Sequence, residues 1–314
     1  MAIYKNTDAI GEREDLSDVI TRITPDETPL FSNMEKVATK GINHEWQVQE
    51  LASAVDNNAN NEGADYSYSN PQPTVRLGNQ HQIFVQAGSV SNTLDTIDKA
   101  GRDKETAYVK VLKGIEQRRD IEKTLCASVA KSASDPRKFG TIETWLSNVS
   151  SAGDATDITA FDGSSVRTDG TARAMTLAQI ETVMQACYED GGNPSMLVVS
   201  PSKKATFSAL SSGSVATNQI QMTASAPQDA VIIGSVSIFL TDFGTLNVVI
   251  DRQMQNDRVY LLDPEYIKMG ALSGRSFSVS DVAPTGDATK FAIVSEMTLI
   301  VNAPKAHGAV YDLS

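Results

Sequence analysis

Two runs of alternating residues, HEWQVQEL at 44–51 and TVRLGNQHQIFVQAG at 74–88, flank the asparagine-rich segment VDNNANNEGADYSYSN at 55–70. Strict alternation of apolar and polar residues predicts strands with one solvent-facing side. The first run has three residues on its apolar face and the second has six: His44, Trp46, Val48, and Val75, Leu77, His81, Ile83, Val85, Ala87. Fifteen residues at about 3.3 Å each reach roughly 50 Å. Because an isolated two-stranded ribbon is marginal in water, this one should lie on its own domain or on a neighbouring molecule.

Composition excludes several classes of protein. The chain has 314 residues, enough for one large or two modest domains, and 40% are hydrophobic. Its net charge of −12 argues against a sequence-specific DNA-binding protein. No apolar run reaches membrane-spanning length, and the first residues lack the apolar core of a secretion signal. Cys126 and Cys187 are interpreted as buried free thiols in a reducing compartment.

Helical periodicity predicts one short and one long helix in the first half of the chain. Leu16, Val19, Ile20 and Ile23 share one face of a short helix that Pro25 and Pro29 should end. Residues 96–132 are predicted as one long helix with a single apolar half. Between Asp98 and Lys131 nine Lys or Arg stand against six Asp or Glu, so this helix is locally basic.

Two arginines on the long helix are ambiguous. Arg118 and Arg119 project toward its apolar half. Either their aliphatic stems pack at the edge of the helix while the charges reach solvent, or they contact a partner subunit or a polyanion.

Helices and strands are segregated in the remainder of the chain, so the fold class is α+β. Residues 147–175, rich in Ser, Asp, Gly and Thr, are expected to form a long loop or a mobile excursion. A capping box at Thr176–Gln179 begins a helix that Gly191 and Gly192 end. The buried strand MLVVS and a helix beginning at Ser200-Pro201 follow, and strands dominate from residue 230 onward.

No residue pattern indicates catalysis or a metal site, so the chain is not expected to be an enzyme or to hold a cofactor. His44, His81 and His307 are scattered and lack zinc-ligand spacing. Ser200 and Lys203 match the four-residue S-x-x-K pattern of penicillin-recognising hydrolases. A Ser-Pro helix start explains the same letters.

Several segments in collinear order resemble a branch of tailed-bacteriophage major capsid proteins. The N-terminal block is GEREDLSDVITRITPDETPLFSNM followed by HEWQVQEL; the C-terminal block comprises SPSKKATFSAL, TDFGTLNVVIDRQMQNDRVYLLDPEYIKMGAL and NAPKAHGAV. The resemblance covers most of the chain, with residues 147–175 and 211–229 the least matched. It implies the Hong Kong 97 capsid fold, which has an N-terminal arm, an extended E-loop, a spine helix, a peripheral domain and an axial domain.

On this resemblance the chain divides into five parts. Residues 1–42 would be the arm, 43–90 the E-loop, 91–175 the spine helix and the first part of the peripheral domain, 176–255 approximately the axial domain, and 256–314 the returning peripheral-domain strands.

The resemblance implies a structural function. The chain would self-assemble into hexamers and pentamers of an icosahedral or prolate phage head that encloses double-stranded DNA by non-specific contact, without a membrane. It would assemble in the host cytoplasm and reside in the virion. A separate scaffolding protein and a portal are expected partners, because no scaffolding region precedes the arm, and a decoration protein is a further candidate.

The resemblance also allows one exclusion. Some shells of this fold form an isopeptide bond from an E-loop lysine, but this chain has no lysine between Lys40 and Lys99. We therefore expect no such cross-link, and stability from non-covalent burial or a cementing protein instead.

Candidate interface residues lie on the ribbon and on the long helix: Trp46, Asn57, Asn58, Tyr66, Tyr68, Arg76, Arg118 and Arg119. Tyr66 and Tyr68 would anchor the tip on a neighbouring subunit, since aromatic residues are enriched at interfaces. A tip exposed to solvent, an encapsulin-like protein compartment, another head or tail protein, and a hydrolase using Ser200 and Lys203 are the alternatives.

Overall fold

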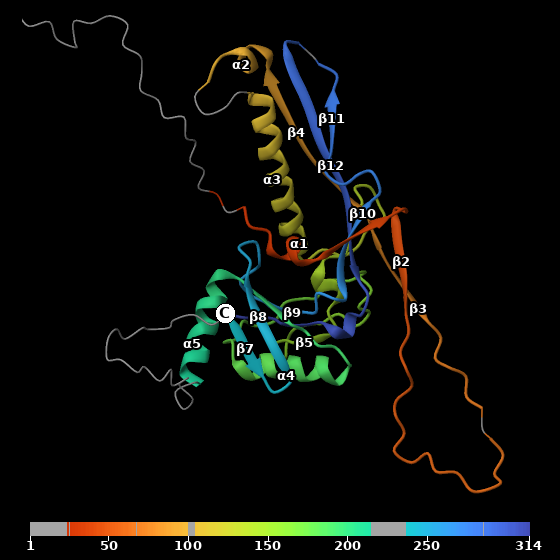
Figure 1. The fold of residues 1–314 in the computed structure, drawn as a ribbon. Coiled ribbons are helices and arrows are strands. Elements are labelled where there is room, and N and C mark those ends of the chain that lie inside the picture. Colours follow the sequence, from red (N-terminus) through yellow and green to blue (C-terminus); the bar gives the residue numbers. More distant parts are fainter. Residues whose placement is uncertain (1–23, 25, 67, 100–103, 215–236, 285) are drawn as a thin grey trace, which may run out of the picture.

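The computed structural model combines two β-sheets, a long helix and a projecting ribbon, which confirms the α+β class (Figure 1). The helix expected over residues 16–23 lies outside the part of the chain that the structure describes. The described residues are 24, 26–66, 68–99, 104–214, 237–284 and 286–314.

A five-stranded sheet is organised around its longest strand, β12 (Ala288–Val301). Along one edge β12 pairs with β4 (Gln82–Ser91) over ten residues. Along the other edge it pairs first with β11 (Ser278–Val282) and then with β10 (Ile267–Leu272). β1 (Glu35–Thr39) extends the sheet by pairing parallel to β10. One strand of the C-terminal part therefore joins segments from both ends of the chain.

The long helix α3 (Glu105–Leu125) lies against one face of this sheet (Figure 1). Gln117 fixes the contact, because its Nε2 donates to the backbone oxygens of Phe84 (2.8 Å) and Ile293 (3.1 Å) on the two paired strands. Gly88 on β4 pairs directly with Phe291 on β12. A glycine is needed at this position, since a Cβ would stand 2.6 Å from the Phe291 ring.

The single helix expected over 96–132 is wrong at both ends. A separate short helix, α2 (Asn92–Thr96), ends at an extended residue, and α3 stops at Leu125. Beyond Cys126 the backbone bonds to a later segment instead: Ser132 exchanges hydrogen bonds with Lys138 (2.9 and 3.0 Å). Tertiary pairing thus overrides the helical periodicity of this stretch.

A six-stranded sheet forms the second half of the molecule. Its order is β5 (Asn148–Ser150), β13 (Gly308–Val310), β9 (Val259–Leu262), β6 (Met196–Val199), β8 (Gly244–Ile250) and β7 (Ile238–Thr241). The helices α4 (Leu177–Glu189) and α5 (Pro201–Ser214) pack on one face and bury a core with Leu197, Leu246 and Leu261. The expected capping box at Thr176 and Gln179 and the helix start at Pro201 are both confirmed.

The main core joins the two halves. Tyr260 and Leu262 from the six-stranded sheet pack in the same buried cluster as Met269 and Leu299 from the five-stranded sheet. Two short 3-10 helices, Ile142–Trp145 and Pro304–Ala306, border this region. The first described helix, α1 (Pro29–Asn33), contributes Leu30 and Phe31 to this core. Pro29 begins α1, as proline at a first helical position allows.

The expected ribbon is shorter than its alternation suggested. β2 (Asn43–Val48) pairs with β3 (Val75–Gln80), but the return run breaks at His81, and β4 joins the five-stranded sheet. The predicted apolar face of that run is correspondingly wrong beyond His81. Ile83 and Val85 are 45% and 55% exposed, whereas Phe84 and Val90 are buried. The chain changes its pairing partner, so the side of the strand that meets the core is reversed.

Residues 147–175, expected as a long loop or a mobile excursion, are mostly irregular after β5 but are anchored to the body. Arg167, with a 2% exposed side chain, pairs with Asp312 (2.8 Å), Asp169 (2.6 Å) and Asp157 (3.2 Å). Its guanidinium also lies 4.2 Å from the centre of the Tyr311 ring. Three carboxylates and a ring thus hold the middle of the segment against the C-terminal residues.

Replacing Arg167 by Met should lower the free energy of unfolding by about 3–5 kcal/mol, because the buried Asp312 carboxylate loses its cation. Urea unfolding of the unassembled chain, followed by circular dichroism, measures this. Arg76→Met is the matched control, since Arg76 pairs with Glu45 at 3.4 Å on the surface and should contribute at most about 1 kcal/mol. Equal effects of the two changes would contradict the anchoring role of Arg167.

Candidate assembly surfaces

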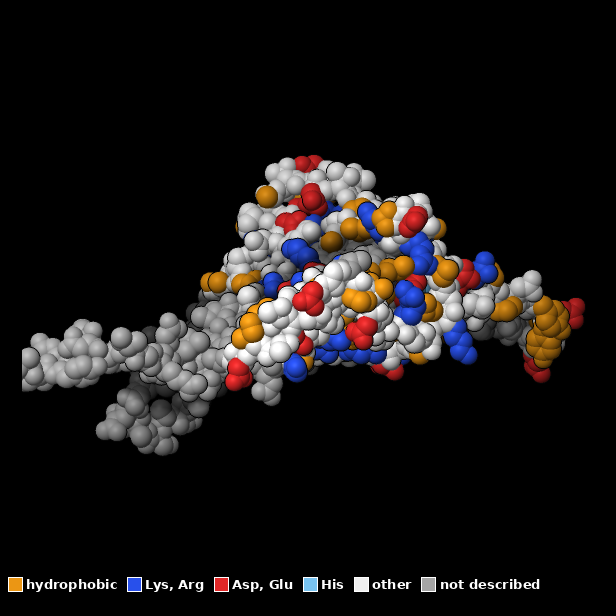
Figure 2. All heavy atoms as spheres, turned by 90° about the horizontal axis from the view of Figure 1, so that it is seen from above, with side chains coloured by type: hydrophobic (Ala, Val, Ile, Leu, Met, Phe, Trp, Pro, Cys, Tyr) orange, Lys and Arg blue, Asp and Glu red, His pale blue; other side chains and the backbone are white. Residues whose placement is uncertain are grey.

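The far end of the ribbon displays apolar side chains that its own subunit does not cover. Leu51, Val55, Tyr66 and Tyr68 are 95%, 71%, 84% and 93% exposed. In the view from above, this end projects well beyond the body and carries hydrophobic and acidic side chains together (Figure 2). Exposed apolar clusters on a projection are typical of surfaces that another molecule covers.

The same end of the ribbon is acidic. Residues 50–66 contain Glu50, Asp56, Glu62 and Asp65 and no Lys or Arg. Asn57 and Asn58, two of the candidate interface residues, lie exposed in this segment, and Arg76 lies on β3 nearer the body, 72% exposed at its side chain. We call residues 51–66 and 68–73 the tip.

The root of the ribbon is buried and held by one amide side chain. Asn79 is fully buried; its Nδ2 donates to the backbone oxygens of Leu299 (2.8 Å) and Gly140 (3.1 Å), and its Oδ1 accepts from the Gly140 amide (2.8 Å). These contacts tie the ribbon to β12 and to the loop before the 3-10 helix. Sequence reasoning missed Asn79, although its position between Leu77 and His81 lies on the predicted apolar face, where a polar residue is the signal that could have identified it.

His81 fixes the neighbouring backbone as a neutral imidazole. The Ile42 carbonyl oxygen can only accept, so the His81 Nδ1 donates to it (2.9 Å). In the neutral imidazole the other nitrogen, Nε2, then accepts from the Thr39 hydroxyl (2.7 Å). Burial is the main cause that lowers the pKa of His81. The two ends of the ribbon, at residues 42 and 81, are thereby joined.

Trp46 belongs to this root and not to the tip. Its ring lies 5.3 Å from that of the buried Trp145. Lys131 adds a contact through Nζ, which donates to the backbone oxygen of Gly78 (3.0 Å). Glu50 pairs with Lys305 at 2.9 Å, a hydrogen bond that is the main cause raising the pKa of Lys305. The ribbon leaves the body at a fixed, well-packed base.

A second uncovered apolar surface is the face of the five-stranded sheet that turns away from α3. Directly paired residues of antiparallel strands share a face. The register of β4, β12 and β11 therefore gathers six apolar side chains there, which we call the outer sheet face: Ile83, Val85, Ala87, Val282, Ala292 and Val294. Val282 is 48% exposed, similar to Ile83 and Val85.

Arg118 and Arg119 take different environments on α3. Arg118 is exposed and its guanidinium lies 5.9 Å from the centre of the Phe277 ring. Arg119 is half-buried and lines a cavity of about 350 Å³ with Gln86, Glu116 and Lys123. Neither environment assigns them a partner.

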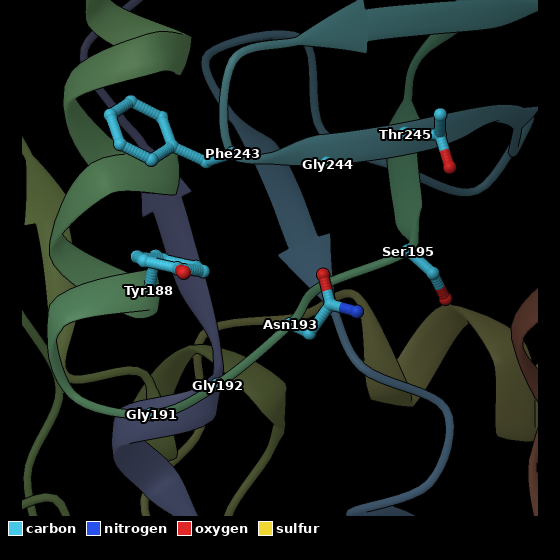
Figure 3. A pocket seen from close by; sticks show the side chains of 8 residues that line it. All are labelled: Tyr188, Gly191, Gly192, Asn193, Ser195, Phe243, Gly244 and Thr245. Carbon is cyan, nitrogen blue, oxygen red and sulfur yellow. The ribbon is translucent and has the colours of Figure 1, made fainter.

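A surface pocket on the six-stranded-sheet side of the molecule is lined by neutral side chains. Its volume is about 690 Å³, and it lies between the end of α4 and the β7–β8 turn, where Tyr188 and Phe243 stand with ring centres 5.7 Å apart (Figure 3). Among the described residues that line it, Tyr188, Asn193, Ser195 and Thr245 supply polar side chains, without a carboxylate or imidazole.

The residues of the S-x-x-K pattern also have structural roles. Ser200 Oγ accepts weakly from the Lys203 amide (3.4 Å) at the start of α5, and Lys203 Nζ bonds to the Ser314 carbonyl oxygen. Cys126 and Cys187 are buried free thiols, as expected. Within the described residues, no three His, Cys, Asp or Glu side chains cluster as metal ligands would, and no helix has the length and apolar character to cross a bilayer.

A ribbon projecting from a long sheet backed by a single helix defines the class: this is the Hong Kong 97-type capsid fold. A chain of the cyanophage A-1(L) capsid superposes with a TM-score of 0.71, covering 96% of this chain and 97% of that one at 12% identity. A chain from the structure of Mycobacterium phage Ogopogo gives a TM-score of 0.57 at 12% identity with 99% of both chains covered. An encapsulin of Synechococcus elongatus PCC 7942 gives 0.58 at 10% identity, covering 97% and 93%.

The sequence places the chain more narrowly. The model of the SU10 major capsid protein family matches residues 3–314, and the chain belongs to that family. The major capsid protein of Escherichia phage Phieco32 is 31% identical over 153 residues, which span 45% of this chain and 44% of that relative. The protein is thus a structural component of a phage shell, as the resemblance in its N- and C-terminal blocks indicated.

Asn79→Ala should lower the free energy of unfolding by about 2–4 kcal/mol, because the buried Gly140 amide loses its acceptor and the Leu299 and Gly140 oxygens each lose a hydrogen bond. Trp145 Nε1 would still donate to the Gly140 oxygen. Hydrogen exchange should also accelerate in β2 and β3. Asn57→Ala on the exposed tip is the matched control and should change neither quantity. Unchanged exchange in β2 and β3 of the Asn79 variant would contradict the role of this residue.

Proposed function

We propose that the chain assembles into hexamers and pentamers that close an icosahedral or prolate head around double-stranded DNA. The observation that carries this proposal is the pair of uncovered apolar surfaces, the tip and the outer sheet face, on a chain whose family forms phage capsids. In an isolated subunit both surfaces expose apolar side chains to water, and a neighbouring copy would bury these side chains.

The tip of one copy is proposed to lie on the outer sheet face of the next. Tyr66 and Tyr68 would supply ring area against Ile83, Val85 and Val282, while the three acidic residues of the tip, Asp56, Glu62 and Asp65, would remain at the rim. The buried root supports this arrangement because it sets the direction in which the ribbon leaves the body. A standard interface buries roughly 1,600 Å² in total, so several modest contacts for each copy would sum to a stable shell.

The five-part division proposed from sequence fits this arrangement with one adjustment. The ribbon that leaves the body runs from β2 to β3, so we place the E-loop at residues 43–80 and assign β4 to the peripheral domain. The six-stranded sheet with α4 and α5 would be the axial domain, although β9, β13 and β5 enter it from outside residues 176–255.

The contents and partners of the shell follow from charge and family. The net charge of −12 would keep packaged DNA mobile along the inner wall. We propose assembly in the host cytoplasm with a separate scaffolding protein and a portal, and a decoration protein as a further partner. A solved structure of phage G with this fold contains major capsid proteins and decoration proteins, which motivates the proposal of a decoration protein here.

Because an encapsulin shares this fold, a compartment that encloses proteins is the alternative to test. Purified shells that contain double-stranded DNA would support the phage head. Shells that contain a protein cargo and no nucleic acid would overturn it in favour of a compartment.

Boiled, denatured shells should run as a single band of monomer mass, because no lysine lies between Lys40 and Lys99 to form a ribbon cross-link. Gel electrophoresis of assembled particles is the measurement. A ladder of covalent oligomers under reducing conditions would show that the shells are cross-linked after all.

The double variant Tyr66→Ala, Tyr68→Ala should raise the concentration needed for assembly by about tenfold or more, since losing an interface aromatic costs on the order of 1.4 kcal/mol or more. Light scattering with negative-stain electron microscopy measures this. The unfolding of the unassembled chain should stay unchanged, because both rings are exposed there. The Tyr→Phe pair is the control and should assemble nearly as the wild type does. Normal assembly of the alanine pair would refute the tip contact.

A further inference from the structure

The N-terminal arm is attached to α3 by one buried carboxylate. Glu122 Oε1 accepts from the Leu30 amide (2.7 Å) and Oε2 from the Phe31 amide (2.8 Å). These amides are at the start of α1, whose preceding residue, Thr28, makes no side-chain cap. Glu122 is thus the capping group of a helix some ninety residues away in the chain, and it replaces the missing local cap.

The attachment is sealed from solvent. Glu122 and Leu30 are 0% exposed and Phe31 is 3% exposed. The Phe31 ring meets the edge of Phe277 with ring centres 6.1 Å apart. Lifting residues 28–34 away would expose both apolar side chains and would also let water reach the carboxylate.

The charges around Glu122 do not neutralise it. Asp251, also 0% exposed, is the nearest like charge, and its Oδ2 accepts from the Cys126 thiol (3.0 Å). Lys123, the next residue on α3, donates to the Gln253 oxygen at 3.3 Å. Lys36 on the arm side donates to the Phe31 and Met34 oxygens, at the other end of α1. Among the described residues no basic side chain is hydrogen-bonded to Glu122.

Two effects on Glu122 therefore oppose each other. Burial, together with Asp251, favours the protonated acid, and the two amides favour the carboxylate. Burial is the larger effect and raises the pKa of Glu122 from 4.5 to about 7. Release of residues 28–34 would remove the two amide donors and let water reach the carboxylate, while Asp251 would remain beside it. Because burial is the larger effect, the pKa of Glu122 would fall toward its ordinary value.

We propose that Glu122 and the docked residues 28–34 form a proton-controlled latch between the arm and α3, closed more tightly when Glu122 carries a proton and opened more readily when it is ionised. The sign follows from linkage: the state that binds the proton more tightly is the docked one, so acid favours docking. Stability from this group is fully present below pH 4.5 and is lost as the pH rises toward 7.

Hydrogen exchange of the Leu30 and Phe31 amides in the unassembled full-length chain tests the latch. After correction for the intrinsic rate, the equilibrium constant for opening should rise about tenfold from pH 6 to pH 8. The amides of β9, in the core shared by both sheets, serve as the internal control and should change much less. A wild-type change below twofold would overturn the proposal.

Glu122→Gln provides the matched variant, since it keeps the shape and one acceptor but cannot ionise. Its opening constant should be independent of pH between 6 and 8. The same tenfold rise in this variant would also overturn the proposal. If the variant does not fold, the wild-type series decides alone. Because the unassembled chain is used, the outcome is independent of whether shells form as proposed.

Discussion

The structure depends on the buried amide of Asn79, which marks the point where the chain stops being a projecting ribbon and becomes part of a sheet. The return run pairs with β2 as far as Gln80 and with β12 from Gln82 onward, so it changes its partner at His81. The Asn79 side chain satisfies backbone groups of Gly140 and Leu299 at that crossing, where unpaired buried groups would otherwise cost stability. The strands β2 and β3, which precede this point, form the projecting ribbon, and β4, which follows it, belongs to the body.

That division separates stability from association. The body is held by a shared core, by Gln117 between helix and sheet, and by Arg167 among its carboxylates. The tip and the outer sheet face contribute little to the single subunit and keep their apolar side chains in water. A shell subunit benefits from this arrangement, because contacts that are weak singly can form and re-form during assembly and still add up over a closed surface. The Glu122 latch adds a third level, in which the position of the arm responds to a proton.

Local patterns in the sequence predicted the elements better than their limits. Alternation located the ribbon from Trp46 and Leu77, and the capping box at Thr176 located α4. The alternation of apolar and polar residues could not show that the return run changes partners at His81. The alternation continues through His81, whereas the side of the strand that is buried is reversed there. Helical periodicity likewise ran past Leu125, where pairing of Ser132 with Lys138 takes over. The anchoring of residues 147–175 depends on Asp312, distant in sequence, so composition alone indicated a loose loop. The family resemblance, in contrast, rested on the order of several blocks and correctly gave the fold.

A cryo-electron microscopy reconstruction of assembled shells is the most direct test of the proposed contact between the tip of one copy and the outer sheet face of its neighbour. We expect ordered density for residues 51–73 across the neighbouring subunit's sheet, with Tyr66 and Tyr68 against Ile83, Val85 and Val282 of that neighbour. A tip that folds back onto its own subunit, or that extends into solvent while the outer sheet face stays bare, would contradict it.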